Sequence, residues 1–424
     1  QGITAFANPS DIVLGKSGDI YISDTDNDRI VRMNRDLKVL EVIESFRIEG
    51  EVSTFSKPQG LFITEDEQLL VSDTGNARVV VLDQQRICQR LYTTPVHKLI
   101  PNDYEFKPVS VAMDTSQRVY VVSKGDNQGI LEFDKQGDFR GYIGAIEVAA
   151  PDFFTALWKS LMSQEQLSRV ESWIPTEYNN IDIDNNGFIF GVVSAIDDPY
   201  NFVRKLNPMG VNVLVQDNQR PVSGDLFYST TNGEKQTSKI VDICTTEYGI
   251  YSILDERKGR IFTYDGLGNQ LFVFGSIGDS FGSVAQPVAI ETDSERCIYV
   301  LDAQYNHIVV YRPTEYAQKI YSAVVSLSKR QYQQSREAWI QVMQYSINSD
   351  MPYISMGKVL MQQKNYKEAM KYFEMVQSTD YYGEAYKLYR QEVMRNLFPF
   401  LILGGLGVII VVFLVLKRKK YSVL

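Results

Sequence analysis

The sequence predicts a mainly β fold class: a six-bladed β-propeller, followed by an α-helical neck and one transmembrane helix. Three observations lead to this prediction. Short segments of alternating apolar and polar residues recur with a period of about 50 residues over most of the chain. Beyond residue 315 the apolar residues recur at helical spacing instead. The segment 397–416 is apolar and uncharged, and it is long enough to cross a bilayer core of about 30 Å.

The repeat begins with a proline-x-x-apolar pattern or a weaker version of it. The first residues of the six copies are Pro9, Pro58, Pro108, Tyr178, Ile240 and Pro287. Each copy continues as a strand, a tight turn, a second strand, a polar turn and a third strand, which predicts β-hairpins. A period of about 50 residues with several short strands is typical of propeller blades. The longer intervals before the fourth and fifth copies predict insertions.

A turn motif of the form D-T-x-N-x-R marks the first two copies. Its residues are Asp24, Asn27 and Arg29 in the first copy and Asp73, Asn76 and Arg78 in the second. We expect Asp and Asn to bridge turn amides, and Arg to pair with a carboxylate of a neighbouring turn. This motif after a strand resembles the NHL repeat. The chain therefore resembles an NHL-type β-propeller protein over about residues 8 to 323, although later copies keep only parts of the motif. The propeller domain is predicted at 1–323.

A helical insertion is predicted at 145–176, where apolar residues recur at helical spacing. Its apolar face is expected either to pack on the propeller or to form a docking surface for a partner or the bilayer. The docking residues would be Phe153, Phe154, Leu157, Trp158, Leu161 and Trp173. The second insertion, 217–238, is polar and is expected to be a loop.

The neck is predicted at 324–396 and resembles one tetratricopeptide repeat. The pattern consists of Met356, Gly357, Leu360, Tyr366, Ala369 and Phe373. Small residues at the positions of Gly357 and Ala369 would let two helices approach closely. One copy with flanking helices is too short for the concave groove of a peptide receptor, so a rigid spacer is the favoured role and partner capture is the alternative.

The apolar segment is followed at once by a basic cluster in the predicted cytoplasmic tail, 417–424. The cluster consists of Lys417, Arg418, Lys419 and Lys420. By the positive-inside rule, the region before residue 397 is expected outside the cell membrane, which implies a signal peptide that has been removed. Within the span, Gly404, Gly405 and Gly407 would form a strip on which another helix could pack.

Composition narrows the function classes. The net charge of -9 and the pI near 5.1 argue against a nucleic-acid partner. The three cysteines are far apart and are expected to be small buried residues, while two histidines offer little for a metal site or a catalytic relay. Residues 182–187 match half of a calcium loop, but Val193 replaces the required glutamate. We therefore expect no metal, no cofactor and no enzymatic activity.

The favoured function is that of a membrane-anchored extracytoplasmic scaffold or accessory subunit, held in the lipid bilayer by one helix and bound to other subunits of a membrane complex. With this arrangement, the chain resembles Firmicutes proteins encoded beside carbohydrate ABC transporter permeases. The resemblance implies that the complex is a bacterial carbohydrate importer. Two alternatives stay open. Exposed aromatics on one rim would indicate a glycan-binding surface receptor, and three convergent carboxylates in the channel would indicate a metal-dependent lactonase or lyase.

Overall fold

The structure is a computed structural model that describes residues 5–145, 177–193, 202–214, 224–225, 228–230, 232–345 and 349–421. It forms two compact units, Gln1–Pro313 and Thr314–Leu424. The sequence analysis placed the end of the propeller at residue 323. The unit boundary falls earlier, because the Thr314 hydroxyl accepts a hydrogen bond from the Ala317 amide (3.3 Å) and caps a helix that starts directly after the last blade.

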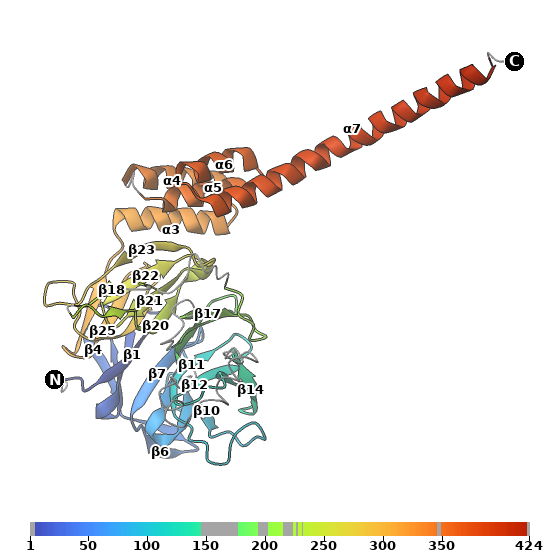
Figure 1. The fold of residues 1–424 in the computed structure, drawn as a ribbon. Helices are drawn as coiled ribbons and strands as arrows, with labels where there is room; N and C mark the ends of the chain where they lie inside the picture. Colours follow the sequence, from blue (N-terminus) through green and yellow to red (C-terminus); the bar gives the residue numbers. More distant parts are fainter. Residues whose placement is uncertain are drawn as a thin grey trace, which may run out of the picture. The chain divides into compact units, whose positions relative to one another are not determined.

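The first unit is a six-bladed β-propeller, which confirms the predicted fold class (Figure 1). Blade 1 comprises β1 (Pro9–Leu14), β2 (Ile20–Asp24), β3 (Arg29–Met33) and β4 (Val39–Ile43). Blade 2 comprises β7 (Pro58–Ile63), β8 (Leu69–Asp73), β9 (Arg78–Leu82) and β10 (Cys88–Thr93). Blade 3 comprises β11 (Pro108–Met113), β12 (Val119–Ser123), β13 (Ile130–Phe133) and β14 (Phe139–Ile143).

The other three blades are also antiparallel. Blade 4 comprises β15 (Tyr178–Ile183), β16 (Ile189–Val193) and β17 (Val203–Leu206). Blade 5 comprises β20 (Ile240–Thr245), β21 (Tyr251–Asp255), β22 (Arg260–Tyr264) and β23 (Gln270–Phe274). Blade 6 comprises β24 (Pro287–Thr292), β25 (Ile298–Asp302) and β26 (His307–Tyr311). Two hairpins connect blades along the chain. The hairpin between blades 1 and 2 consists of β5 (Ser45–Ile48) and β6 (Glu51–Thr54), and the hairpin between blades 4 and 5 consists of β18 (Tyr228–Ser229) and β19 (Lys235–Gln236). Three short 3-10 turns are η1 (Thr25–Asn27), η2 (Thr74–Asn76) and η3 (Glu247–Gly249).

The first strand of each blade lies beside the first strands of both neighbouring blades, and β24 contacts β1, which closes the ring. Every first strand carries a β-bulge near its start, as between Pro9 and Asp11 in β1. The residue after the bulge is aliphatic and buried in all six blades: Ile12, Leu61, Val111, Ile181, Ile243 and Ile290. The proline-x-x-apolar pattern therefore marks a side chain that packs between blades.

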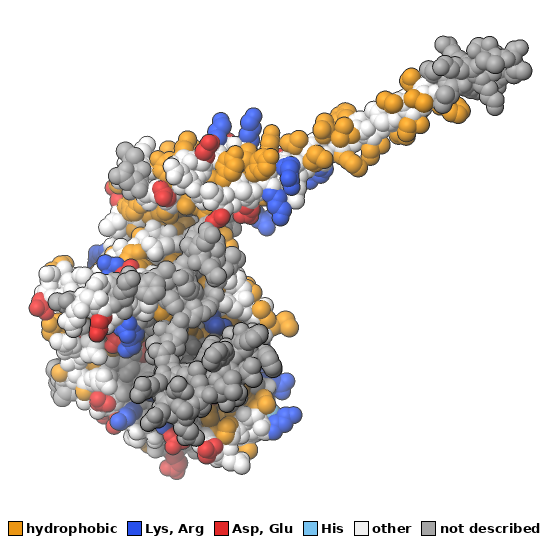
Figure 2. All heavy atoms as spheres, in the orientation of Figure 1, with side chains coloured by type: hydrophobic (Ala, Val, Ile, Leu, Met, Phe, Trp, Pro, Cys, Tyr) orange, Lys and Arg blue, Asp and Glu red, His pale blue; other side chains and the backbone are white. Residues whose placement is uncertain are grey.

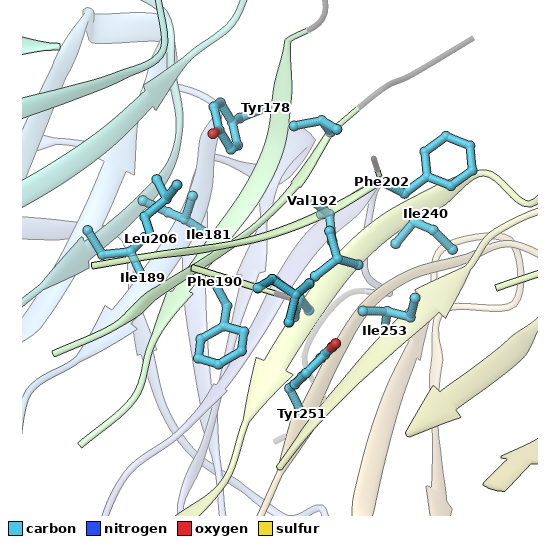
Figure 3. Close-up of a cluster of buried hydrophobic side chains, with 14 of the residues drawn as sticks. Tyr178, Ile181, Ile189, Phe190, Val192, Phe202, Leu206, Ile240, Tyr251 and Ile253 are labelled. Atoms are coloured by element: carbon cyan, nitrogen blue, oxygen red, sulfur yellow. The ribbon is translucent and has the colours of Figure 1, made fainter. Parts of the chain in front are cut away.

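The hydrophobic core is divided into clusters that lie between adjacent blades. One cluster joins blades 3, 4 and 5 and contains Tyr178, Phe190 and Tyr251 (Figure 3). The ring centroids of Phe190 and Tyr251 are 5.1 Å apart, and Tyr251 stacks on Tyr264 at 5.3 Å. Because successive side chains of a strand point to opposite faces, each blade buries one set of apolar residues against each neighbour.

The second unit is helical. Its helices are α3 (Glu315–Ser328), α4 (Tyr332–Tyr345), α5 (Met351–Gln362), α6 (Tyr366–Met375) and α7 (Thr379–Tyr421). Each helix packs on the next one along the chain. Gly357 lies against Phe373 so closely that a Cβ at Gly357 would be 2.4 Å from the ring, which fits the predicted close approach of two helices. The assignment to the tetratricopeptide family stays a prediction.

Candidate functional site: an acidic channel in the propeller

A cavity of about 550 Å³ is lined by the first strands of all six blades and by turns that follow them. Two positions of the first strands contribute to its lining: the bulge residue, which is third in the strand, and the fifth residue. The residues at these positions that line the cavity are Asp11, Asn180, Asp242, Val13, Phe62, Asp182 and Glu291. In strand geometry these two layers are about 7 Å apart. The third-position residues are Asp11, Gly60, Ser110, Asn180, Asp242 and Ala289, and the fifth-position residues are Val13, Phe62, Ala112, Asp182, Cys244 and Glu291.

Side chains of the third-position layer connect neighbouring blades. The Asp11 carboxylate accepts hydrogen bonds from its own following amide, Ile12 (2.8 Å), and from the Leu61 amide of the next blade (2.7 Å). Asp242 does the same for the Ile243 amide (2.7 Å) and the Ile290 amide (2.6 Å). Because a bulge leaves backbone amides without strand partners, carboxylates at this position satisfy them and join two blades.

The fifth-position layer has two different walls. Blades 1 and 2 contribute Val13 and Phe62, which are apolar. Blades 4 and 6 contribute the carboxylates of Asp182 and Glu291, and the thiol of Cys244 in blade 5 is buried in the core between blades. Asp182 accepts hydrogen bonds from the Thr245 amide (2.7 Å) and hydroxyl (2.8 Å), whereas one oxygen of Glu291 accepts from the Thr292 amide (2.7 Å). The channel is thus acidic on one side and apolar on the other at this depth.

The clustered carboxylates influence one another. Burial raises the pKa of Asp11 to about 7 and that of Asp182 to about 6, against opposing hydrogen bonds from backbone amides. Burial also raises the pKa of Asp242 and Glu291 well above the ordinary value, with a further contribution from the neighbouring Asp11 and Asp182 charges. The Cys244 thiol has a raised pKa for the same reasons, burial first and Glu291 second. A full set of negative charges is therefore unfavourable here at neutral pH.

The cavity lining as a whole is acidic. Carboxylates among the lining residues are Asp11, Glu65, Asp66, Asp114, Asp182, Asp184, Asp242, Glu247, Glu291 and Asp293, and the basic lining residue is Arg296. Asp184 is 6% exposed, and its Oδ1 accepts hydrogen bonds from the Asn186 and Phe188 amides (both 2.9 Å). Its Oδ2 is buried and has no hydrogen-bond donor within the part of the chain that the structure describes. An acceptor is therefore available for a ligand at the edge of this cavity.

The motif residues of the NHL-type turns lie at the C-terminal ends of the second strands, in the turns to the third strands. The buried Asp73 carboxylate accepts hydrogen bonds from the Ser56 amide (2.7 Å), the Asn76 side chain (2.9 Å) and Arg78 Nε (2.7 Å). We expected the arginine to pair with a neighbouring turn. It pairs instead with its own turn, because the register of β8 and β9 places Asp73 opposite Arg78.

Asp24, Asn27 and Arg29 repeat this arrangement in blade 1, with Arg29 Nε 2.7 Å from the Asp24 carboxylate. The link to the next blade comes from the threonine of the motif. Thr25 donates to the Pro58 carbonyl (2.7 Å), and Thr74 donates to the Pro108 carbonyl (2.5 Å). The turn motif therefore stabilises the ring and does not line the channel.

The other sequence-predicted sites belong to other segments of the chain. The insertion 145–176, with all six of its proposed docking residues, lies outside the described residues. Gly404, Gly405 and Gly407 are exposed on α7 with open space beside them, and the backbone of 417–420 continues the same helix. The half calcium loop covers the end of β15 and the hairpin turn to β16, and its first residue, Asp182, lines the channel cavity.

The channel carboxylates are not recognisable as a group in the sequence. They come from strands of four blades and share no linear motif, so they read as scattered charges. The signal that could have found them is the position within the repeat: once the proline-x-x-apolar starts are aligned, acidic residues fall on the third or fifth position of the strands in blades 1, 4, 5 and 6.

Comparison with known proteins supports the propeller assignment. The NHL repeat family model matches residues 6–33. This match contains β1 to β3 and the first turn motif. No curated protein sequence matches the chain significantly.

Solved structures resemble the chain in fold. Virginiamycin B lyase from Staphylococcus aureus is 13% identical, with a TM-score of 0.41, over 74% of this chain and 87% of the lyase. A streptogramin B lyase is 10% identical, with a TM-score of 0.41, over 71% of this chain and 92% of that one. A protein of unknown function from Bacteroides thetaiotaomicron is 14% identical, with a TM-score of 0.48, over 73% of this chain and 70% of its own.

One expectation is contradicted at this point. We expected no enzymatic activity, whereas the structures that match include virginiamycin B lyase, which is an enzyme. The expectation rested on the scarcity of histidine and on carboxylates that looked scattered. The fold gathers four of those carboxylates in one channel, so the premise was wrong. The likeness is one of fold, and it assigns no activity to this chain.

Proposed function

We propose that the protein is a membrane-anchored subunit of a membrane complex, with the propeller outside the bilayer and a ligand site in its channel. The observation that carries this proposal is helix α7. Near its start, Tyr381 stacks on Phe373 of α6 (5.4 Å between centroids) and Ala385 is fully buried. Further along, the helix is long and apolar enough to cross a membrane, and its apolar stretch is not buried (Figure 2). A helix of this length and apolarity is suited to crossing a bilayer.

The glycine strip supports assembly with other subunits. Gly404, Gly405 and Gly407 present backbone without side chains, so a second helix could approach closely there. A scaffold role for the helical unit and a carbohydrate importer as the complex follow from the family resemblance. Transporter permeases are therefore the first partners to test.

Topology is tested by adding a protease to intact cells that display the full chain. The proposal expects loss of the propeller and survival of a fragment that contains 397–424. Protection of the propeller from the protease, with digestion only after lysis, would overturn the outside orientation.

Assembly is tested by co-purification in mild detergent. Replacing both Gly404 and Gly407 with Leu should weaken recovery of partners, because side chains would separate helices that touch through their backbones. Leu406→Phe is the matched control, since about 100° per residue places it on the other side of the helix. Recovery of the wild-type chain alone, in every growth condition, would contradict the scaffold role.

A second candidate function is acid–base chemistry in the channel, because Asp182 and Glu291 share a partly apolar site in which burial raises both pKa values. Hydrolysis of simple lactones by the full chain, lost in Glu291→Gln, would support it. Activity that persists in Glu291→Gln would place any such reaction elsewhere.

A further inference from the structure

We propose that the channel binds an aliphatic diamine or polyamine, with ammonium groups against the carboxylates of blades 4 to 6 and methylene groups against the apolar wall of blades 1 and 2. This inference goes beyond the proposed function and does not depend on the membrane anchor. It rests on the charge of the lining, the position of one orphan acceptor, the two-sided wall and the spacing of the layers.

Charge selects a cation. Ten carboxylates and one arginine line the described cavity, so an anion would meet repulsion from nearly every side. Burial raises the pKa of Asp11, Asp182, Asp242 and Glu291, and the charges of neighbouring carboxylates add to each shift. A bound cation would relieve that repulsion between carboxylates.

The orphan acceptor indicates where a donor should be placed. Asp184 Oδ2 is buried at the channel lining and has no donor among the described residues. The Lys205 ammonium is within electrostatic range of Asp184 but donates its hydrogen bond to the Gly266 carbonyl (3.1 Å). An ammonium N–H from a ligand would supply the missing partner and remove the cost of an unsatisfied buried acceptor.

Shape favours an organic ligand over a bare metal ion. No group of three or more His, Cys, Asp or Glu side chains is placed to hold a metal ion in the described part of the chain. The carboxylates lie instead in layers about 7 Å apart along the strands, a separation that a short methylene spacer between two ammonium groups can cover. Val13 and Phe62 provide an apolar surface for that spacer.

Binding should release protons. A bound ammonium favours ionised carboxylates, so affinity should rise from about pH 6 to about pH 8 as these groups lose their protons. The groups that face this cluster from the surrounding strands and turns are Asp11, Glu65, Asp66, Asp114, Asp182, Asp184, Asp242, Cys244, Glu247, Glu291, Asp293 and Arg296, with Lys205 beside Asp184. Most are acidic, so the direction of the pH effect is set by carboxylates.

Glu291→Gln is the cleanest variant. One Glu291 oxygen accepts the Thr292 amide, and the glutamine oxygen can keep that hydrogen bond while the charge is lost. Asp182→Asn is a second variant, although its amide group would face the Thr245 amide or hydroxyl and lower stability. Glu44→Gln is the matched control, because Glu44 is exposed and is not among the cavity lining.

The test is calorimetric titration of the full chain, in an uncharged detergent at low salt, with spermidine. We expect one saturable site per chain, affinity roughly tenfold weaker in Glu291→Gln, and no change in Glu44→Gln. 1,4-Diaminobutane should bind better than butylamine, which has one ammonium group. The heat measured in buffers of different ionisation enthalpy should show proton release at neutral pH.

Three results would overturn the proposal. The first is no saturable binding of spermidine or 1,4-diaminobutane by the wild-type chain. The second is binding that Glu291→Gln and Asp182→Asn both leave unchanged, since that would locate it on the acidic surface outside the channel. The third is tighter binding of Ca²⁺ or Mg²⁺ alone than of spermidine, lost in Glu291→Gln, which would make the channel a metal site. The outcome is separate from the protease test, because it needs neither a partner nor an oriented membrane.

Discussion

Replacing Asp73 with Asn should destabilise the propeller strongly although the side chain keeps its shape. The Asp73 carboxylate is fully buried, and its two oxygens accept from the Ser56 amide, Asn76 and Arg78. An asparagine has one acceptor oxygen, so its NH₂ group must face at least one of these donors. Losing a buried acceptor costs about 1–3 kcal/mol, and leaving Arg78 without its charge partner adds about 1.5–3 kcal/mol. We expect a loss of about 3–5 kcal/mol.

The matched control is Asp302→Asn in blade 6. Asp302 occupies the same strand end, but His307 stands opposite it, and among the described residues it accepts hydrogen bonds from backbone amides. Without a charged partner, its loss should cost about 1–3 kcal/mol. Urea denaturation of the full chain in an uncharged detergent, followed by β-sheet circular dichroism, measures both values.

A double-mutant cycle with Arg78→Met isolates the ion pair. The coupling energy between Asp73 and Arg78 should be about 1.5–3 kcal/mol, since removing both partners leaves no uncompensated buried charge. The reasoning would be refuted by a cost below about 1 kcal/mol for Asp73→Asn, or by an equal cost in Asp302→Asn with no coupling to Arg78.

Three further predictions concern packing, titration and metals. Gly60→Ala should lower the free energy of unfolding by about 2 kcal/mol or more, because its Cβ would lie 2.6 Å from the Ser110 Cα. Gly383→Ala has open space in a helix and should raise the free energy of unfolding by up to about 1 kcal/mol. Thermal unfolding compares the two variants. Burial raises the Glu291 pKa above the ordinary 4.5, so the wild type loses stability as pH rises through the folded pKa. The melting temperature of Glu291→Gln minus that of the wild type should therefore increase from about pH 5 to about pH 8. A difference that does not change with pH would contradict this prediction. Chelators should leave the melting temperature unchanged, and a drop of several degrees would indicate a structural metal.

The sequence by itself determined the features that depend on local pattern. The proline-x-x-apolar starts predicted where each blade begins, because a bulge and a buried aliphatic residue recur there in every copy. The apolar run 397–416 predicted a transmembrane helix, and the structure has one helix there that is long and apolar enough to cross a membrane, since length and composition alone define that property. The D-T-x-N-x-R turns predicted a hydrogen-bonded Asp, although not which arginine would reach it.

Only the tertiary structure decided which side chains meet in the channel. Asp11, Asp182, Asp242 and Glu291 lie far apart in the chain, and no single blade holds more than one of them. They become neighbours because the ring closes between β24 and β1, so that the first strands of all blades face one axis. Their raised pKa values follow from burial and from mutual repulsion, and both are properties of the closed ring and not of any segment.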